Sequence, residues 1–154
     1  MARGYRTGII KKGNGEDSNE LKLFFGGAVD GVTWTFNRKL PDSDSKESHY
    51  IDDKLNISTS GYYAEGQWSS PQIDLTDYSK LYINMTQSTG AERKIGVGIS
   101  NSLKNYASQV TNPGAGLTTI DISNLTGFYY VNLYTQSGNR SSGIIKVSHV
   151  WLQK

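Results

Sequence analysis

Residues that could perform catalysis are few in this sequence and lie far apart. It has no cysteine, and its two histidines are His49 and His149. No serine lies in a G-x-S-x-G context, so neither a thiol nor a serine nucleophile is indicated. His149 alternates with Val147 and Trp151, which favours a hydrogen-bonded histidine in or beside a buried strand over a general base or a metal ligand.

The acidic side chains form no evident pair for acid–base chemistry. A glycosidase needs two carboxyl groups that face each other across a cleft, one of them with a raised pKa. The acidic residues instead fall mostly in predicted loops: Asp42, Asp44, Glu47, Asp52, Asp53, Asp74 and Asp77. The sequence therefore predicts a protein that is not an enzyme and has no catalytic residues.

The segment PDSDSKESHYIDD (41–53) concentrates oxygen-bearing side chains. Because Ca²⁺ takes roughly six to eight oxygen ligands, this segment could wrap a calcium ion. It lacks the ligand spacing of an EF-hand loop and the glycine that such a loop needs for its turn. A solvated loop is the favoured interpretation, so no cofactor and no metal site are expected, with a structural calcium ion as the alternative.

Tyrosine and asparagine recur at alternate positions of LYINMTQ (81–87) and FYYVNLYTQ (128–136). Alternate side chains of a strand face opposite sides of the sheet. The aliphatic residues between them should face the core, and this outward set forms a second candidate face: Tyr82, Asn84, Tyr130, Asn132 and Tyr134. One interpretation is that tyrosine suits a half-buried strand face. The other is a ligand face of aromatic planes and amides, beside which Gly96 and Gly98 leave room.

The elements that position these residues are short strands. Period-two alternation and turn residues predict strands at 21–25, 32–36, 54–59, 62–70, 81–87, 94–100, 118–123, 128–136 and 144–153. Segments 37–49 and 101–117 are predicted loops, and no helix-period segment of useful length is present. The last strand is apolar on both faces and should be central. The pattern predicts an all-β protein, an antiparallel β-sandwich of the jelly-roll type. The tripeptide TQS recurs after two strands, which predicts two similar hairpins.

Strand parity groups the loops into two ends of the sandwich. If neighbouring strands alternate in direction, segments 71–79, 101–117 and 137–143 share one end, and recognition often lies in loops held on a rigid scaffold. Arginine and amides around an aromatic ring can bind sugar hydroxyls. The first candidate carbohydrate-binding site is Asn105, Tyr106, Gln109, Asn139 and Arg140, with Tyr78 near it and with Trp68 and Tyr63 as further exposed candidates.

Composition and charge narrow the class of partner. A chain of 154 residues has the length of one domain. Ten tyrosines, 17 glycines and a charged fraction of 19% suit recognition of neutral polar ligands. The net charge of +2 comes without a cationic stripe, which argues against nucleic acid. The sequence has no apolar run of membrane-spanning length and no signal-peptide apolar region, so no membrane partner is expected.

Residues 1–20 are expected to form a flexible basic arm, either a disordered terminus or a docking arm, and residues 21–154 the β-sandwich domain.

The order of several segments resembles a known group of modules. KLNISTSGYYAEGQWSSPQIDLTDYSKLYINM (54–85), RKIGVGIS (93–100), TTIDISNLTGFYYVNLY (118–134) and IKVSHVWLQ (145–153) are similar to galactose-binding-like jelly-roll modules of structural and tail proteins from phages of Gram-positive bacteria. The resemblance covers roughly residues 21 to 154 and implies a non-catalytic module, often carbohydrate-binding, mounted on a virion. No ligand set transfers residue by residue, because the binding loops of that group vary.

Together, residues and resemblance predict a phage virion protein, a tail or head appendage, that binds host cell-wall carbohydrate. It would be assembled in the host cytoplasm, contact other virion proteins and form a homo-oligomer, because repeated copies raise avidity. The alternative is a purely structural decoration or connector protein whose aromatic outer face is a subunit interface.

Overall fold

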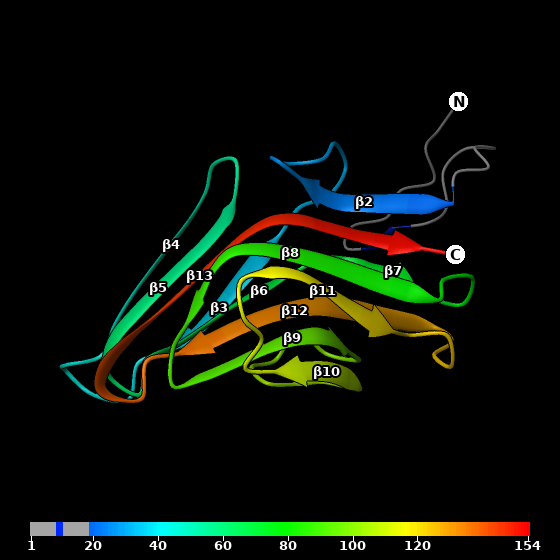
Figure 1. Ribbon diagram of the computed structural model, residues 1–154. Coiled ribbons are helices and arrows are strands. Elements are labelled where there is room, and N and C mark those ends of the chain that lie inside the picture. The colour runs from blue at the N-terminus through cyan, green and yellow to red at the C-terminus, as the bar shows by residue number, and fades with distance from the viewer. Residues whose placement is uncertain (1–8, 11–18) are drawn as a thin grey trace.

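The computed structural model describes residues 9–10 and 19–154, and its regular structure is entirely β (Figure 1). Its strands are β1 (Ile9–Ile10), β2 (Glu20–Phe25), β3 (Thr35–Lys39), β4 (Lys46–Ile51), β5 (Leu55–Tyr62), β6 (Glu65–Ser69), β7 (Gln72–Asp74), β8 (Lys80–Thr89), β9 (Glu92–Gly98), β10 (Ser108–Thr111), β11 (Gly116–Asp121), β12 (Phe128–Gln136) and β13 (Asn139–Gln153). Within those ranges, no helix meets the length and apolarity that crossing a membrane requires. The predicted all-β class is confirmed.

The strands form two sheets that pack face to face as an antiparallel sandwich. In the first sheet, β12 is central, with β9 and then β10 on one side and with β6 and β7 on the other; β3 pairs with β6, and β1 pairs with β7 in parallel. In the second sheet, β13 is central, with β8 and then β11 on one side and with β5 and β2 on the other; β4 pairs with β5. The predicted central position of the last strand is confirmed.

The core between the sheets contains the aliphatic residues of the alternating pattern. Leu81, Ile83 and Met85 of β8 face Val131 and Leu133 of β12, and all five are buried. Burying one such side chain contributes roughly 1.5–3 kcal/mol. The two core tryptophans use their indole N–H groups to bind backbone carbonyls, as buried indoles usually do: Trp34 donates to Leu23 and Trp68 to Asn56, each at 3.1 Å.

The predicted hairpins are wrong, because the chain changes sheet at each of these turns. β8 belongs to the second sheet and β9 to the first, while β12 belongs to the first and β13 to the second. Both TQS tripeptides therefore precede a crossing between layers. The crossings lie together at the lower left of Figure 1, where Ala91 N binds Gln136 O at 2.9 Å and Tyr63 N binds Gly138 O at 2.6 Å. Gly138 has a φ of 81°, a conformation that suits glycine.

Two predicted loops contain strands. Segment 37–49 includes the end of β3 and the start of β4, both at sheet edges and mostly exposed, so no apolar alternation marks them. Segment 101–117 contains β10, which pairs with β9. Because β10 adds one strand, each later strand runs opposite to the direction that the sequence predicted. The turn at 137–143 consequently lies with the β5–β6 and β8–β9 turns, and 123–127 lies with 75–79, where Leu75 N binds Gly127 O at 2.9 Å.

The predicted arm, residues 1–20, lies largely outside the described residues. Within it, β1 pairs with β7, and β2 begins at Glu20. The division into an arm and a domain stays a prediction.

Candidate functional site

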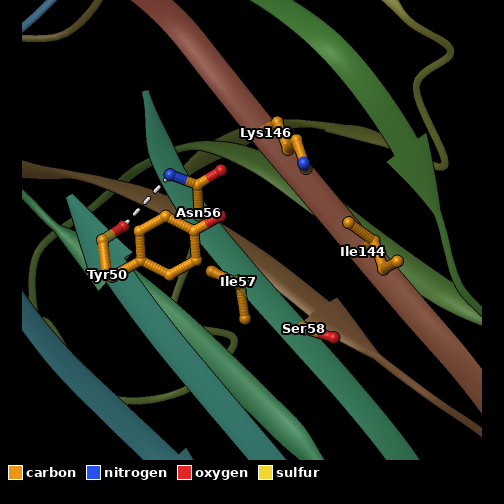
Figure 2. A pocket seen from close by; sticks show the side chains of 6 residues that line it. All are labelled: Tyr50, Asn56, Ile57, Ser58, Ile144 and Lys146. Carbon is orange, nitrogen blue, oxygen red and sulfur yellow. Dashed lines mark hydrogen bonds between the residues drawn. The ribbon is translucent and has the colours of Figure 1, made fainter. Parts of the chain in front are cut away.

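A pocket opens on the outer face of the second sheet, where β4, β5 and β13 lie side by side. Tyr50 of β4 and Lys146 of β13 are both register partners of Asn56 on β5. All three side chains lie on one face, and two strand spacings of roughly 5 Å separate the outer two. Figure 2 shows Tyr50 on one side of the pocket and Lys146 on the other.

The pocket has a volume of about 190 Å³ and is lined by Tyr50, Asn56, Ile57, Ser58, Ile144 and Lys146. Ser58, the next outward residue of β5, is the register partner of Ile144 and has a short side chain. The pocket exists because two long side chains flank a floor built from Asn56 and Ser58. The Tyr50 residue is 53% exposed, so its ring is open to a ligand.

Asn56 is held by the β4–β5 turn and does not fill the pocket. Its amide nitrogen donates to Tyr50 O at 3.3 Å, Asp52 Oδ1 at 2.9 Å and Lys54 O at 3.0 Å. The hydrogen bond from Asn56, followed by the one from the Lys54 backbone, lowers the pKa of Asp52 below its ordinary value. Asp52 therefore stays ionised at neutral pH and fixes the turn beside the pocket.

Three hydroxyl or ammonium groups of the pocket make no hydrogen bond or ion pair within the described residues: the Tyr50 hydroxyl, the Ser58 hydroxyl and the Lys146 ammonium. Together they offer one cationic donor and two groups that can both donate and accept. Ile144 adds an apolar wall. This arrangement can bind a small polyhydroxylated ring by stacking and hydrogen bonds.

The acidic segment 41–53 contributes to turns rather than to a cluster of ligands. Asp42 Oδ1 accepts from Asp44 N at 2.9 Å, and Asp52 Oδ1 accepts from Lys54 N at 2.8 Å, as short Asx turns do. Across the described part of the chain, no three His, Cys, Asp or Glu residues gather as metal ligands.

The first candidate set is split between two places. Asn105 and Tyr106 lie against the outer face of the first sheet, and Gln109 is exposed on β10. Asn139 and Arg140 lie at the β12–β13 turn, where Arg140 pairs with Asp44 at 2.9 Å. The prediction of one loop cluster is therefore wrong, because β10 reverses the strand parity on which it depended.

The further candidates also differ from expectation. Trp68 and Tyr78 are buried in the core, and only Tyr63 is exposed. Trp68 lies on the inward face of β6, the opposite face from Gln67, so its indole packs between the sheets.

The second candidate face is also split. Tyr82 and Asn84 lie on β8 in the second sheet, whereas Tyr130, Asn132 and Tyr134 lie on β12 in the first. Since each set points away from the core, the two sets occupy opposite outer faces of the sandwich and cannot bind one ligand together. Tyr82 and Tyr130 are half-buried, but Asn132 and Tyr134 are fully buried.

The chain itself covers Asn132 and Tyr134. Residues 99–107, which we call the covering segment, fold back across the outer face of the first sheet. Asn132 Nδ2 donates to Ser100 O at 3.0 Å and to Asn105 O at 2.9 Å. Gln67 Nε2 donates to Asn101 O and Ser102 O, and Gln67 Oε1 accepts from Lys104 N at 3.1 Å. The outward amides therefore bind protein backbone rather than a ligand.

The space beside Gly96 and Gly98 is filled in the same way. A Cβ atom added at Gly98 would lie 2.0 Å from Asn105 O, and one at Gly96 would lie 2.0 Å from Ser108 O. Because the two glycines have no side chain, the backbone that follows β9 can pack directly against them. The expectation that they leave room for a ligand is wrong.

Two tyrosines, one within the covering segment and one under it, have raised pKa values. The Tyr106 hydroxyl donates to Lys94 O at 2.9 Å, and burial, followed by the charge of Glu92, raises the pKa of this phenol well above its ordinary value. Tyr134 donates to Glu65 Oε1 at 2.6 Å, and burial, followed by this bond, raises its pKa as well. Both phenols are structural hydrogen-bond donors.

An aromatic cluster occupies another part of the second sheet's outer face. The rings of Tyr82 and Trp151 stack at 4.9 Å, and Phe25 makes edge contacts with Trp151 at 5.8 Å and with His149 at 4.6 Å. Phe25 is 42% exposed, and Leu117, the register partner of Asn84 on the edge strand β11, is 56% exposed. We call these five residues (Phe25, Tyr82, Leu117, His149 and Trp151) the aromatic patch.

No family model matches the sequence, and no curated protein matches it. Solved structures do resemble the fold. A family 11 carbohydrate-binding module from Clostridium thermocellum, in complex with a β-1,3-1,4-mixed-linked tetrasaccharide, is 17% identical with a TM-score of 0.52, over 87% of this chain and 95% of that module. The family 11 module of a cellulosomal cellulase of the same organism is 16% identical with a TM-score of 0.53, over 90% and 96%. A mutant of a family 29 carbohydrate-binding module is 14% identical with a TM-score of 0.52, over 88% and 92%. These likenesses support the predicted jelly-roll β-sandwich.

Proposed function

We propose that this protein is a non-catalytic carbohydrate-binding module whose ligand lies in the pocket between Tyr50 and Lys146. The observation that carries the proposal is an exposed aromatic ring facing unpartnered polar groups across a short floor. An aromatic face packs against the C–H groups of a sugar, while hydroxyl and ammonium groups bind its oxygens. The likeness to carbohydrate-binding modules supports carbohydrate as the class of ligand.

The finer proposal is that the module serves on a phage virion and contacts host cell-wall saccharide. Its support is the resemblance of segments 54–85 and 118–134 to phage tail modules. A single pocket of this size suits weak binding, on the order of mM or about 4 kcal/mol. Repeated copies on a particle would add avidity without new contacts, so a homo-oligomer attached to other virion proteins belongs to the same proposal.

Filling the pocket tests the proposal. Ser58→Trp places an indole on the pocket floor at an exposed position, so the fold should tolerate it. Calorimetric titration with bacterial cell-wall polysaccharide should show affinity at least tenfold lower, a loss of about 1.4 kcal/mol or more. The matched control is Thr86→Trp, at an exposed position of β8 outside the pocket. Equal binding by the two tryptophan variants would move the saccharide to another surface.

A second function is favoured by the aromatic patch. Exposed aromatic and aliphatic side chains gathered on one sheet face are also what subunit interfaces use. In this alternative the protein is a structural decoration or connector, and the patch binds a second copy. Phe25→Ser combined with Leu117→Ser, both exposed positions, should then convert an oligomer to a monomer in size-exclusion chromatography while polysaccharide binding persists. An unchanged elution volume would reject the patch as the interface.

A further inference from the structure

Charge distinguishes the pocket from a site for neutral sugars. Lys146 is a half-buried residue, and its ammonium group has no acidic partner among the described residues. Four other lysines of the described residues do have one: Lys54 pairs with Asp53, Lys80 with Asp121, and both Lys94 and Lys104 with Glu92. The positive charge at the pocket is therefore left uncompensated.

The strands beside Lys146 do not supply the missing negative charge. Its register partners are Asn56 on β5 and Gln87 on β8, both neutral amides. The acid nearest along the turn is Asp52, whose Oδ1 already accepts from the Asn56 side chain and the Lys54 backbone. Because the Lys146 residue is half-buried, its attraction for an anion is screened less than in bulk water, where the dielectric constant is higher.

The geometry places this cation opposite the aromatic ring. Tyr50 and Lys146 lie one strand to either side of Asn56, so roughly 10 Å separates their backbones. A pocket of about 190 Å³ is smaller than the roughly 300 Å³ at which drug-sized sites begin, so it suits a single sugar ring. A ring stacked on Tyr50 would direct an exocyclic substituent toward the ammonium group.

We infer that the pocket selects saccharides that carry an anionic group on the ring held by Tyr50, with Lys146 binding that group. The inference rests on the proposed function and names its substrate class. The shared chemistry is a carboxylate, as in a uronic acid, or a phosphate, as in a sugar phosphate. A charge-assisted hydrogen bond is about twice as strong as a neutral one, so the anionic group should dominate discrimination while Tyr50 and Ser58 hold the ring.

The test is an NMR titration of the pocket amides with sugars that differ only at carbon 6. The probes are galactose, galacturonate and galactose 6-phosphate, together with the corresponding glucose series. At low salt, the anionic members should bind at least tenfold more tightly than the neutral hexose. The preference should shrink as ionic strength rises, because salt screens the pair. A preference for the carboxylate would assign uronic acids, and one for the phosphate would assign sugar phosphates.

Two lysine variants make the result decisive. Lys146→Met keeps the length of the side chain and should abolish the preference, so that anionic and neutral hexoses bind with equal affinity. Lys39→Met removes the same charge at an exposed position of the first sheet and should preserve the preference. Equal affinities across a series, or a preference that survives Lys146→Met, would overturn the inference and leave the proposed function standing. If no hexose of either series shifts the pocket amides, the proposed function fails with it.

Discussion

Replacing Asn132 by alanine is expected to lower the free energy of unfolding by about 3 kcal/mol, because one buried and two partly buried hydrogen-bonding groups would lose their partner. The Asn132 side chain accepts from Ser69 Oγ at 2.6 Å and donates to the carbonyls of Ser100 and Asn105. Asn132 is fully buried, so water can take the place of its side chain only if the covering segment opens. For a domain of this length, the melting temperature should fall by roughly 10 °C, measured by thermal unfolding followed by circular dichroism.

Asn37→Ala is the matched control. The Asn37 side chain also donates to the covering segment: its amide nitrogen lies 2.7 Å from Asn101 O, but this hydrogen bond is exposed. Water can replace it, so the expected loss is about 0.5 kcal/mol. An equal fall in the free energy of unfolding of both variants would mean that burial under the covering segment contributes nothing to stability.

The phenol of Tyr106 gives a second readout for Asn132→Ala. Burial raises its pKa in the folded protein, so the neutral phenol stabilises the fold below pH of about 10, and this contribution is lost as the pH rises above that value. Loosening the covering segment should expose the phenol and lower its pKa toward the ordinary value. Tyrosinate absorbance should consequently appear at lower pH in Asn132→Ala than in the parent protein.

The sequence was sufficient to predict most of the aliphatic core, although not the burial of Trp68. Leu81, Ile83 and Met85 alternate with polar residues, and a one-residue shift in register would expose all of them. The central position of β13 followed from apolar residues on both of its faces. These features depend on burial, which apolar periodicity reports directly.

Some edge strands escaped the same reasoning, although the edge strands β2 and β11 were predicted. β3, β4 and β10 lie at sheet edges and carry polar side chains, as protected edges commonly do. Reading segments 37–49 and 101–117 as loops removed β4 and β10 from the list of strands. The first loss concealed the pocket, since Tyr50 had no assigned face, and the second reversed the grouping of the loops.

The sequence does not reveal what an outward-facing amide side chain binds. Asn132 faces away from the core in the predicted manner, yet it binds the backbone of Ser100 and Asn105. A side chain that binds solvent, a saccharide or its own chain shows the same alternation in the sequence. Only the path of residues 99–107 decides among them, and nothing local in Asn132 encodes that path.

This covering also bears on where a saccharide can bind. On the first sheet, the outward polar groups of Gln67, Asn132 and Tyr134 are already hydrogen-bonded. On the second sheet, Tyr50, Ser58 and Lys146 present groups without such partners. A ligand gains most where it satisfies groups that the fold has left open, which favours the pocket over the β12 face that the sequence singled out.

Gly98→Ala should be strongly destabilising. Its Cβ would lie 2.0 Å from Asn105 O and 2.7 Å from Asn105 C. Backbone atoms cannot move aside as a side chain would, so the covering segment must lift from β9. Overpacking of this kind costs about 3 kcal/mol, and the loss can be measured by chemical denaturation. Gly114→Ala is the matched control, because a Cβ there meets nothing within 4 Å, and it should be neutral.

Combining Gly98→Ala with Asn132→Ala decides whether the two residues support one structure. Both changes release the same segment, one by collision with Asn105 and the other by loss of hydrogen bonds to it. Once the segment has lifted, the second change has little left to disrupt. The free energy of unfolding of the double variant should thus fall by clearly less than the sum of the two single falls, with an interaction energy of about 1–2 kcal/mol. Additive losses would show that Gly98 and Asn132 act on separate parts of the fold.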